Sequence, residues 1–366
     1  MEVKITKETL LKGIQTVQNA VSQKSGLPIL LNILFETLKD NKIRLIATDL
    51  EIGIISTINT EVQEEGAVSI PAKKISDIVK ELPNEKINLS AKKNNQITIK
   101  CEKSIFKIMG LPKEEFPKVP ELVDKDSLIL PQKLLKAMLN MTSFAISKDE
   151  TRYVLNGILF LATEKSLCLV ATDGRRLALI ERELPKPGGL KKKVIVPAKA
   201  VSELMRILKD EGEVKISFSE NQLSFELDDT LLITRLIEGE YPNFEQVIPK
   251  EIQNKLRLNK GRFYSATKRA SLLTTPDSQS VKLDVFKNKL IISKNAQDGS
   301  ESREEVDCSY SGEEMTIGFN PTYLMDALKN IDEEEIGLEL TSPDKPGVIR
   351  AGGNSYIYII LPMQLG

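Results

Sequence analysis

The chain has 366 residues, about twice the usual length of a domain, and 41% of them are hydrophobic, so we expect two or three domains with apolar cores. Lysine and arginine number 51 against 52 aspartates and glutamates, so the net charge is close to zero. The sequence contains no histidine, which excludes Ser-His-Asp and Cys-His catalysis and removes the most common transition-metal ligand.

The first third of the chain predicts a helix, a series of strands and a second helix. Leu10, Ile14 and Val17 mark the apolar face of the first helix. Alternating apolar and polar residues at 42–47 and 96–100 predict β-strands on either side of the second helix, which spans 75–82.

The same series follows twice more along the chain. In the middle third, Pro131 opens a helix expected to reach residue 148, because proline suits the first helical turn. The later helix of that third and the two helices of the last third are predicted at residues 201–208, 263–273 and 324–331. Two helices with many antiparallel strands in each third predict an α+β fold, with the helices packed on one face of the sheets.

Comparison of the chain with itself explains this recurrence. The segment that begins Ile70-Pro71-Ala72 returns as Val196-Pro197-Ala198 and again as Phe319-Asn320-Pro321, and Ala47-Thr48-Asp49 returns as Ala171-Thr172-Asp173. Because the period is about one domain length, the chain is predicted to be three tandem repeats of one domain. We expect bounds of 1–124, 125–250 and 251–366, with linkers at 120–126 and 249–251.

Cysteine usage and hydropathy exclude further classes. Cys101, Cys168 and Cys308 lie far apart without a CxxC pair, so buried thiols are expected rather than disulfides or a zinc site. The N-terminus has no hydrophobic signal core, and no stretch approaches the roughly 20 apolar residues of a membrane span. We therefore expect a cytoplasmic protein with no membrane segment, no metal, no cofactor and no catalytic residues.

Charge is segregated along the chain. Residues 131–148 and 259–275 carry lysines and arginines with no acidic residue, whereas acids gather in predicted loops such as 301–307 and 332–335. One basic helix face is ordinarily only solvated, but two at equivalent places in a repeat favour a surface that meets phosphates without reading sequence. Aromatic residues make up 5% of the chain and tryptophan is absent, which argues against recognition by base stacking.

Several motifs, in this order and spacing, resemble the bacterial DNA polymerase III beta subunit family, the DNA sliding clamps. They are residues 27–30, 152–157, 171–178, 310–315, 317–320 and 361–363. The resemblance covers the whole chain. It implies a non-enzymatic processivity factor, in which two subunits associate head to tail into a closed ring of six similar domains, with the helices lining a hole that encircles duplex DNA.

The resemblance also implies three sets of site residues. DNA would be contacted by Lys24, Lys73, Arg152, Tyr153, Lys199 and Arg206. The dimer joint would pair Phe106 and Ile108 with Leu272 and Leu273. A groove between the second and third domains would be lined by Leu155, Thr172, Gly174, Arg175, Arg176, Leu177, Pro242, Val247, Asn320, Tyr323, Pro346, Ile359, Leu361, Pro362 and Met363. This groove would bind short peptides of the replicative polymerase alpha subunit, the clamp loader, and other polymerases and repair proteins.

The sequence departs from the family pattern within that groove. Arg175 stands where histidine is common, Asp344 replaces an apolar wall residue, and Gln364 stands where a terminal arginine is common, with Gly366 extending the tail. These departures affect which peptides are preferred. The acid at Asp149 is unfavourable for phosphate, so it is not assigned to DNA.

Two other functions compete with the clamp. A three-repeat protein-binding scaffold without DNA encirclement would not need the acid-free basic helices. A glycosidase-like enzyme would need paired carboxylates, for example Asp173 with Glu203 or Glu240, but the chain lacks an aromatic sugar platform. Residues 187–193 combine glycine with lysine but lack the GKS/T ending of a phosphate-binding loop, so a solvated loop is expected.

Overall fold

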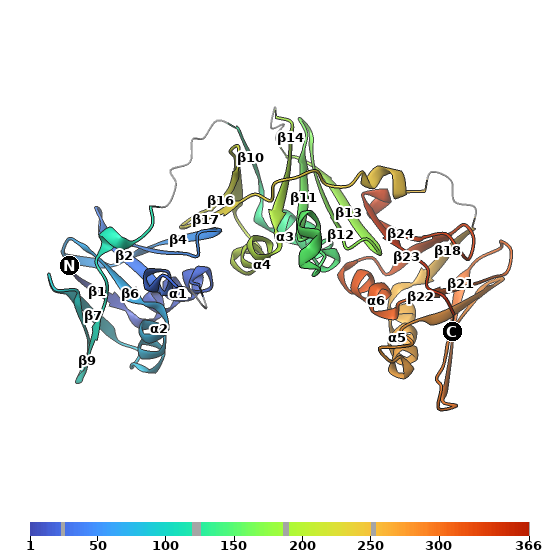
Figure 1. Cartoon of the computed structure of the whole chain (residues 1–366), viewed down its shortest axis with the longest axis horizontal. Coiled ribbons are helices and arrows are strands. Elements are labelled where there is room, and N and C mark those ends of the chain that lie inside the picture. The colour runs from blue at the N-terminus through green and yellow to red at the C-terminus, as the bar shows by residue number, and fades with distance from the viewer. Residues whose placement is uncertain (23–25, 119–125, 186–189, 250–253, 366) are drawn as a thin grey trace. The chain divides into compact units, whose positions relative to one another are not determined.

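The computed structural model describes residues 1–22, 26–118, 126–185, 190–249 and 254–365 (Figure 1). Lys24 and most of the two predicted linkers lie outside the described residues. The chain divides into two compact units, which are described separately: the first comprises Met1–Lys133 and Ser202–Leu236, and the second Leu134–Val201 and Ile237–Gly366. Helices α3 (Gln132–Asn140) and α4 (Ala198–Ile207) each contribute residues to both units.

The first unit contains two antiparallel sheets and helices α1 (Lys7–Val17) and α2 (Ala72–Glu81). Its strands are β1 (Glu2–Thr6), β2 (Asn32–Leu38), β3 (Lys42–Thr48), β4 (Ile52–Asn59), β5 (Glu61–Glu64), β6 (Ala67–Pro71), β7 (Lys86–Ala91), β8 (Gln96–Cys101), β9 (Ser104–Met109), β10 (Asp126–Pro131), β15 (Glu213–Phe218), β16 (Gln222–Leu227) and β17 (Thr230–Arg235). The five-stranded sheet has the order β5-β1-β7-β8-β9, and the eight-stranded sheet has the order β10-β15-β16-β17-β4-β3-β2-β6.

The second unit contains one antiparallel sheet of 12 strands and helices α5 (Lys260–Ala270) and α6 (Pro321–Asn330). Its strands are β11 (Gly157–Ala162), β12 (Ser166–Thr172), β13 (Arg176–Glu183), β14 (Lys192–Pro197), β18 (Asn254–Asn259), β19 (Val281–Phe286), β20 (Lys289–Asn295), β21 (Glu301–Ser309), β22 (Met315–Phe319), β23 (Glu335–Leu340), β24 (Gly347–Ala351) and β25 (Tyr356–Ile360). Their order is β14-β11-β12-β13-β25-β24-β23-β18-β21-β20-β19-β22.

Helices α1 and α5 begin where a polar cap precedes an apolar face. The Thr6 side chain accepts a hydrogen bond from the backbone N–H of Thr9 at the start of α1, and Asn259 caps α5 in the same way through Arg262. Such caps satisfy backbone donors that the first helical turn leaves without partners. The inward faces of α1 and α5 are buried, as their periodicity predicts.

The helix predicted from Pro131 to residue 148 is shorter than expected. Pro131 ends strand β10, and α3 runs from Gln132 only to Asn140, so the prediction was wrong at both ends. The Thr142 hydroxyl donates a hydrogen bond back to the carbonyl of Met138 at 2.9 Å, a local bond that competes with helix continuation. Lys148 therefore lies outside the helix, and the acid-free stretch is not one continuous basic face.

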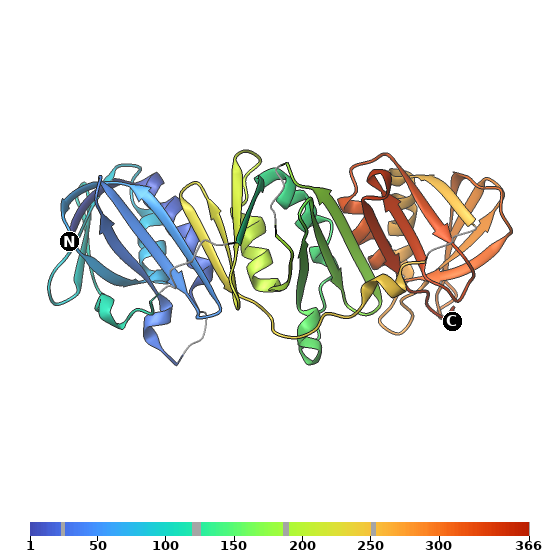
Figure 2. The same ribbon diagram turned by 90° about the horizontal axis from the view of Figure 1, so that it is seen from above.

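Sheets continue from one repeat into the next, as Figure 2 shows for the yellow strands of the second repeat beside the blue strands of the first. Strand β17 pairs with β4, with Leu232 opposite Ile54, and strand β25 pairs with β13, with Tyr358 opposite Ala178. The two pairings are equivalent under the repeat. This is why the two compact units do not follow the repeat bounds: the second repeat shares a sheet with each neighbour.

Candidate partner-binding site and nucleic-acid interface

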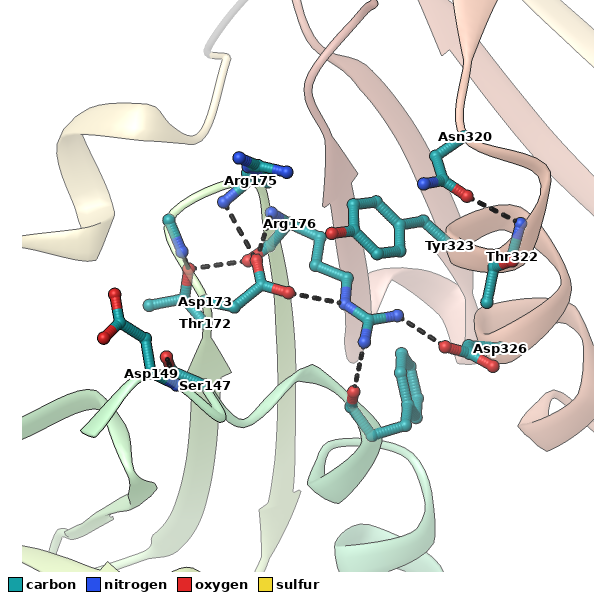
Figure 3. Close-up of polar contacts among 12 residues, drawn as sticks. Ser147, Asp149, Thr172, Asp173, Arg175, Arg176, Asn320, Thr322, Tyr323 and Asp326 are labelled. Atoms are coloured by element: carbon teal, nitrogen blue, oxygen red, sulfur yellow. Dashed lines mark hydrogen bonds and ion pairs between the residues drawn. The ribbon is translucent and has the colours of Figure 1, made fainter. Parts of the chain in front are cut away.

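A tight turn between β12 and β13 forms one side of the site. The Asp173 carboxylate accepts hydrogen bonds from the backbone N–H groups of Arg175 at 2.9 Å and Arg176 at 3.0 Å. The Thr172 hydroxyl accepts a bond from the N–H of Gly174 and donates one to the carbonyl of Arg176. Gly174 has φ +85°, a conformation that favours glycine. The turn thus holds Arg175 exposed and Arg176 directed inward (Figure 3).

Arg176 is the most highly connected side chain of this turn. Its Nε donates to Asp173 at 3.0 Å, Nη1 donates to Asp326 of α6 at 2.6 Å, and Nη2 donates to the carbonyl of Phe144 at 2.6 Å (Figure 3). The guanidinium also lies over the ring of Tyr323, with its central carbon 4.3 Å from the ring centroid. The side chain is 10% exposed. Burial alone would lower the pKa of Arg176, but the hydrogen bond to Asp326 and nearby charges outweigh it, so the pKa is raised and the group stays cationic.

Helix α6 forms the opposite side. Asn320 caps the helix by accepting a hydrogen bond from the N–H of Thr322 at 2.9 Å, and Pro321 occupies the first turn. The Tyr358 hydroxyl donates to the carbonyl of Tyr323 at 2.8 Å, and its ring lies 5.7 Å from that of Phe144. Burial raises the pKa of Tyr358, so its hydroxyl remains a donor at neutral pH.

An apolar cluster brings several predicted groove residues together. Leu155, Leu177 and Ile359 belong to one buried cluster, with Thr172 at the end of a strand beside them. Sequence reasoning missed other members that lie in or against this cluster: Leu159, Cys168, Val170, Leu179, Ile195, Tyr241, Val348, Phe244 and Ile248. Phe244 opens the 3-10 helix Phe244–Val247 and Ile248 follows it in extended backbone, so no helical spacing in the sequence marked these two residues.

The remaining predicted groove residues lie at its margins. Pro242 and Val247 are exposed, and Val247 retains 51% of its accessible surface. Pro346 is half-buried just before β24, and Asp344 beside it accepts a hydrogen bond from Ser342. That bond lowers the pKa of Asp344, so the acid is charged at neutral pH.

The C-terminal segment is fixed to both sides of the site. The backbone N–H of Leu361 donates to the carbonyl of Arg175 at 2.9 Å, and that of Met363 donates to the carbonyl of Gly318 at 2.8 Å. Pro362, which lies between them, has no N–H to donate. Leu361 is 42% exposed, so the segment offers an apolar side chain to solvent beside the turn.

The predicted DNA residues are distributed over both units. In the first unit, Lys73 is exposed on α2, and Arg206 of α4 pairs with Glu203 at 2.5 Å, so part of its charge is already neutralised. In the second unit, Tyr153 is 59% exposed beside Arg152 in a 3-10 helix, Glu150–Leu155.

Lys199 is exposed in the first turn of α4. All these cations except Arg152 belong to α-helices, as a helix-lined surface requires. Each unit thus presents some of the predicted DNA contacts.

Of the four predicted joint residues, two are exposed and two are half-buried. Phe106 is 40% exposed on β9, which is the edge strand of its sheet, and Ile108 is half-buried on the same strand. Leu272 is 77% exposed in the 3-10 helix Ser271–Leu273 that follows α5, and Leu273 beside it is half-buried. Exposed apolar groups of this size on an edge strand and on a helix end are typical of interfaces.

Comparisons with known proteins agree with these features. Models of the N-terminal, central and C-terminal domains of the DNA polymerase III beta subunit match residues 1–120, 129–243 and 245–364. The beta sliding clamp of Chlamydia pneumoniae is 34% identical over 365 residues, which cover 100% of this chain and 99% of the relative. That of Staphylococcus aureus strain Mu50 is 34% identical over 376 residues, with the same coverage.

Solved structures show the same similarity. The DNA polymerase sliding clamp from Bacillus subtilis has a TM-score of 0.96 with 30% identity, and a putative DNA polymerase III beta subunit from Eubacterium rectale has 0.95 with 32% identity. Both comparisons cover 100% of each chain.

Three tandem domains of this fold, each with helices on antiparallel sheets, define the class of polymerase processivity clamps. The chain belongs to the DNA polymerase III beta subunit family. Its function is therefore that of a DNA sliding clamp, which is not an enzyme and which works with DNA, a polymerase and a second subunit. The scaffold alternative is not favoured. Within the described residues, every helix is too short or too polar to cross a membrane.

Proposed function

We propose that two copies of this chain close head to tail into a ring around duplex DNA, through pairing of β9 in one copy with β21 in the other. The observation that carries this is the strand pairing at the two junctions within the chain. At each junction the last strand of a repeat pairs with a fixed strand of the preceding repeat: β17 with β4, and β25 with β13.

Within the described residues, the equivalent strands β9 and β21 belong to different sheets and do not pair with each other. Strand β9 corresponds to β17 and β25, and it lies at the edge of its sheet. Strand β21 corresponds to β4 and β13. One neighbour, β20, pairs with residues 301–307, whereas the other, β18, pairs only at Cys308 and Ser309. In the part of the chain that the structure describes, the edge from Glu301 to Glu305 is thus open to a further strand. A head-to-tail contact of this kind closes when the rotation per subunit allows it.

Transferring the register of the internal junctions gives a specific pairing. Phe106 takes the place of Leu232 and Ser302 that of Ile54, so Phe106 lies opposite Ser302 of the partner subunit. Ser104 then faces Glu304 of the partner subunit, and Lys107 faces Glu301 of the partner subunit. Opposite charges directly across a strand pair stabilise the pairing, so the basic β9 and the acidic β21 are complementary.

Paired cysteines test this register. Ser104→Cys combined with Glu304→Cys, in a chain with Cys308→Ser, should give a covalent dimer under mild oxidation, because directly opposite residues lie within disulfide reach. The matched control is Ser104→Cys with Arg303→Cys. A shift by one residue turns the side chains to opposite faces, so crosslinking should drop sharply. Equal crosslinking of both pairs, or of neither, contradicts the proposed joint.

Encirclement is tested on plasmid DNA. After loading with a clamp loader and ATP, the protein should stay on closed circles and be lost when the plasmid is linearised. Equal loss from both forms would mean that binding is not topological. Because a clamp acts on replicating DNA, we also propose that the protein works in the cytoplasm, where bacterial DNA replicates.

We further infer that the apolar cluster with Arg175, Tyr323 and the C-terminal segment binds a short peptide of the replicative polymerase alpha subunit, the clamp loader, and other polymerases and repair proteins. A buried apolar cluster with the exposed side chains of Val247 and Leu361 at its margins, and with few polar orienting groups, supports this assignment. A labelled synthetic peptide from the cognate polymerase serves as the probe. Val247→Asp should weaken binding, whereas Leu272→Asp, an exposed leucine outside the site, should not. Unchanged binding to the Val247 variant would count against the site.

The three domain bounds, 1–124, 125–250 and 251–366, also belong to this proposal. Limited proteolysis of the full chain should cleave first near residues 120–126 and 249–251. Early cleavage inside the sheets that cross the junctions would contradict those bounds.

A further inference from the structure

We propose that Arg176 is a positioning residue that fastens α6 to the β12–β13 turn and so sets the spacing between the two sides of the peptide site. This inference rests on the proposed peptide site. The peptide itself would contact the exposed neighbours of Arg176, among them Arg175 and the cluster surface, and not the Arg176 guanidinium.

The contacts of Arg176 leave little of the group for a ligand. Three of its N–H donors are used, one each toward Asp173, Asp326 and the carbonyl of Phe144. A guanidinium has five such donors in a fixed plane, and here that plane packs against the ring of Tyr323. With 10% of the side chain exposed, the cation is directed into the protein. Figure 3 shows Arg175, by contrast, pointing away from Asp326.

Two of the three partners come from distant parts of the sequence. Asp173 precedes Arg176 in the same turn, Phe144 lies in the 3-10 helix Ser143–Ala145, and Asp326 lies in α6 of the third repeat. One side chain therefore joins the second repeat to the helix that carries Tyr323. Three hydrogen bonds from one planar group, together with its contact to the Tyr323 ring, fix direction as well as distance, which a flexible lysine would not do.

The junction between the first and second repeats shows that two repeats can join without an arginine at this position. By strand register Ile52 takes the place of Arg176, opposite Thr234 as Arg176 is opposite Ile360. Glu203, the sixth residue of α4, takes the place of Asp326, the sixth residue of α6. Glu203 is instead bonded by Asn19 and Arg206. The strand pairing is the same, yet the buried cation occurs at the junction that carries the peptide site.

Removing the cation should therefore disturb the site more than the fold. Asp326 and Asp173 would lose the charge that compensates them, and two acids near each other repel. The expected response is displacement of α6 and Tyr323 from the turn. Affinity for the peptide falls because the two sides no longer fit it together.

Peptide affinity of full-length variants tests the inference. With the labelled polymerase peptide as the probe, Arg176→Met and Asp326→Asn should each lower affinity about tenfold, equivalent to about 1.4 kcal/mol. The double variant should be scarcely weaker than either single variant, because both remove the same link. Arg175→Ala is the matched control for a neighbouring arginine that is exposed.

Salt dependence separates positioning from direct contact. A cation that touches an acidic peptide contributes to the slope of affinity against salt, whereas a buried, internally paired cation does not. We expect Arg176→Met to weaken binding without changing that slope, and Arg175→Ala to change it. Hydrogen exchange in α6 should rise in both Arg176→Met and Asp326→Asn, while both remain dimers.

Each outcome decides between the two proposals. If the wild-type protein does not bind the peptide, the proposed site fails and the Arg176 inference fails with it. If the wild type binds and Arg176→Met binds equally well, only the inference is overturned. Loss of affinity with a reduced salt slope, and no effect of Asp326→Asn, would make Arg176 a ligand contact and overturn its positioning role.

Discussion

Gly174 and Arg176 lie two positions apart in one turn, and few other residue types could replace either of them. Gly174 adopts φ +85°, and a Cβ placed there would lie 2.7 Å from Nη1 of Arg152, a flexible group that can move away. The steric contact is therefore minor, and the backbone conformation decides the effect of substitution. Arg176 needs a planar, permanently charged group, which only arginine supplies.

Gly174→Ala should destabilise the protein by about 1 kcal/mol, because an L-residue with a Cβ is strained in the left-handed region. It should also weaken peptide binding, since the turn presents Arg175. Thermal unfolding and peptide affinity measure the two effects. Gly337→Ala is the control, because that glycine has open space around its Cβ position and no positive φ. Equal loss of stability in both variants would show that the Gly174 conformation is not the cause.

A second prediction concerns alkaline pH. Burial raises the pKa of Cys168 from 9.0 to about 12. A raised folded-state pKa means that the associated stability is complete below pH 9 and is lost as the pH rises toward 12. Cys168→Ala should remove part of that alkaline loss while costing some packing at neutral pH. Urea unfolding at pH 8 and pH 11 measures it, and an unchanged difference between the two pH values would contradict the prediction.

At the level of elements, periodicity predicted where the helices lie but not always where they end. The buried faces of α1 and α5 follow from Leu10, Ile14, Phe263 and Ala266, whose spacing is visible in the sequence. The early end of α3 depends on local hydrogen bonds of Thr142, which apolar spacing does not report. Likewise, Phe144 and Asp326 lie far from Arg176 in sequence, so the internal role of Arg176 could not be predicted from the turn alone.

The exposed side chain of Leu272, in the 3-10 helix Ser271–Leu273, leads to a prediction about assembly of the dimer. Leu272→Asp should raise the dimer dissociation constant at least about 100-fold, because each of the two joints would lose about 1.4 kcal/mol or more by burying a charge. Stability of the isolated subunit should change little, since Leu272 is 77% exposed in the single chain.

Sedimentation equilibrium and thermal unfolding measure these two quantities. Val247→Asp is the control: it adds the same charge at a 51% exposed position but lies outside the proposed joint. A dimer that survives the Leu272 change, or one that the Val247 change breaks equally, would place the joint elsewhere.

For the whole molecule, the sequence predicted the repeat, the fold class and the family, because each recurs as a pattern along the chain. It did not predict two compact units that differ from the three repeats, since strand pairing across the junctions depends on contacts between distant segments. The net charge, with 51 basic and 52 acidic residues, likewise conceals how charge is distributed. In the proposed ring, function would depend on that distribution, with basic helices facing DNA and an acidic β21 facing the partner subunit.

Lys73 and Lys199 provide a test of the helical surface as a whole. Both are exposed near the start of equivalent helices, α2 and α4. Contacts with phosphates release counterions, so replacing both lysines with glutamine should reduce the salt slope of DNA affinity by about 0.9 for each lost contact. Retention of a loaded ring on closed circles should persist, because encirclement does not depend on any one contact. Lys191→Gln with Lys193→Gln, two exposed lysines at the start of β14, is the control and should leave the slope unchanged. An equal change of the salt slope in both double variants would mean that DNA is attracted by the positive charge of the surface in general and not by the helices.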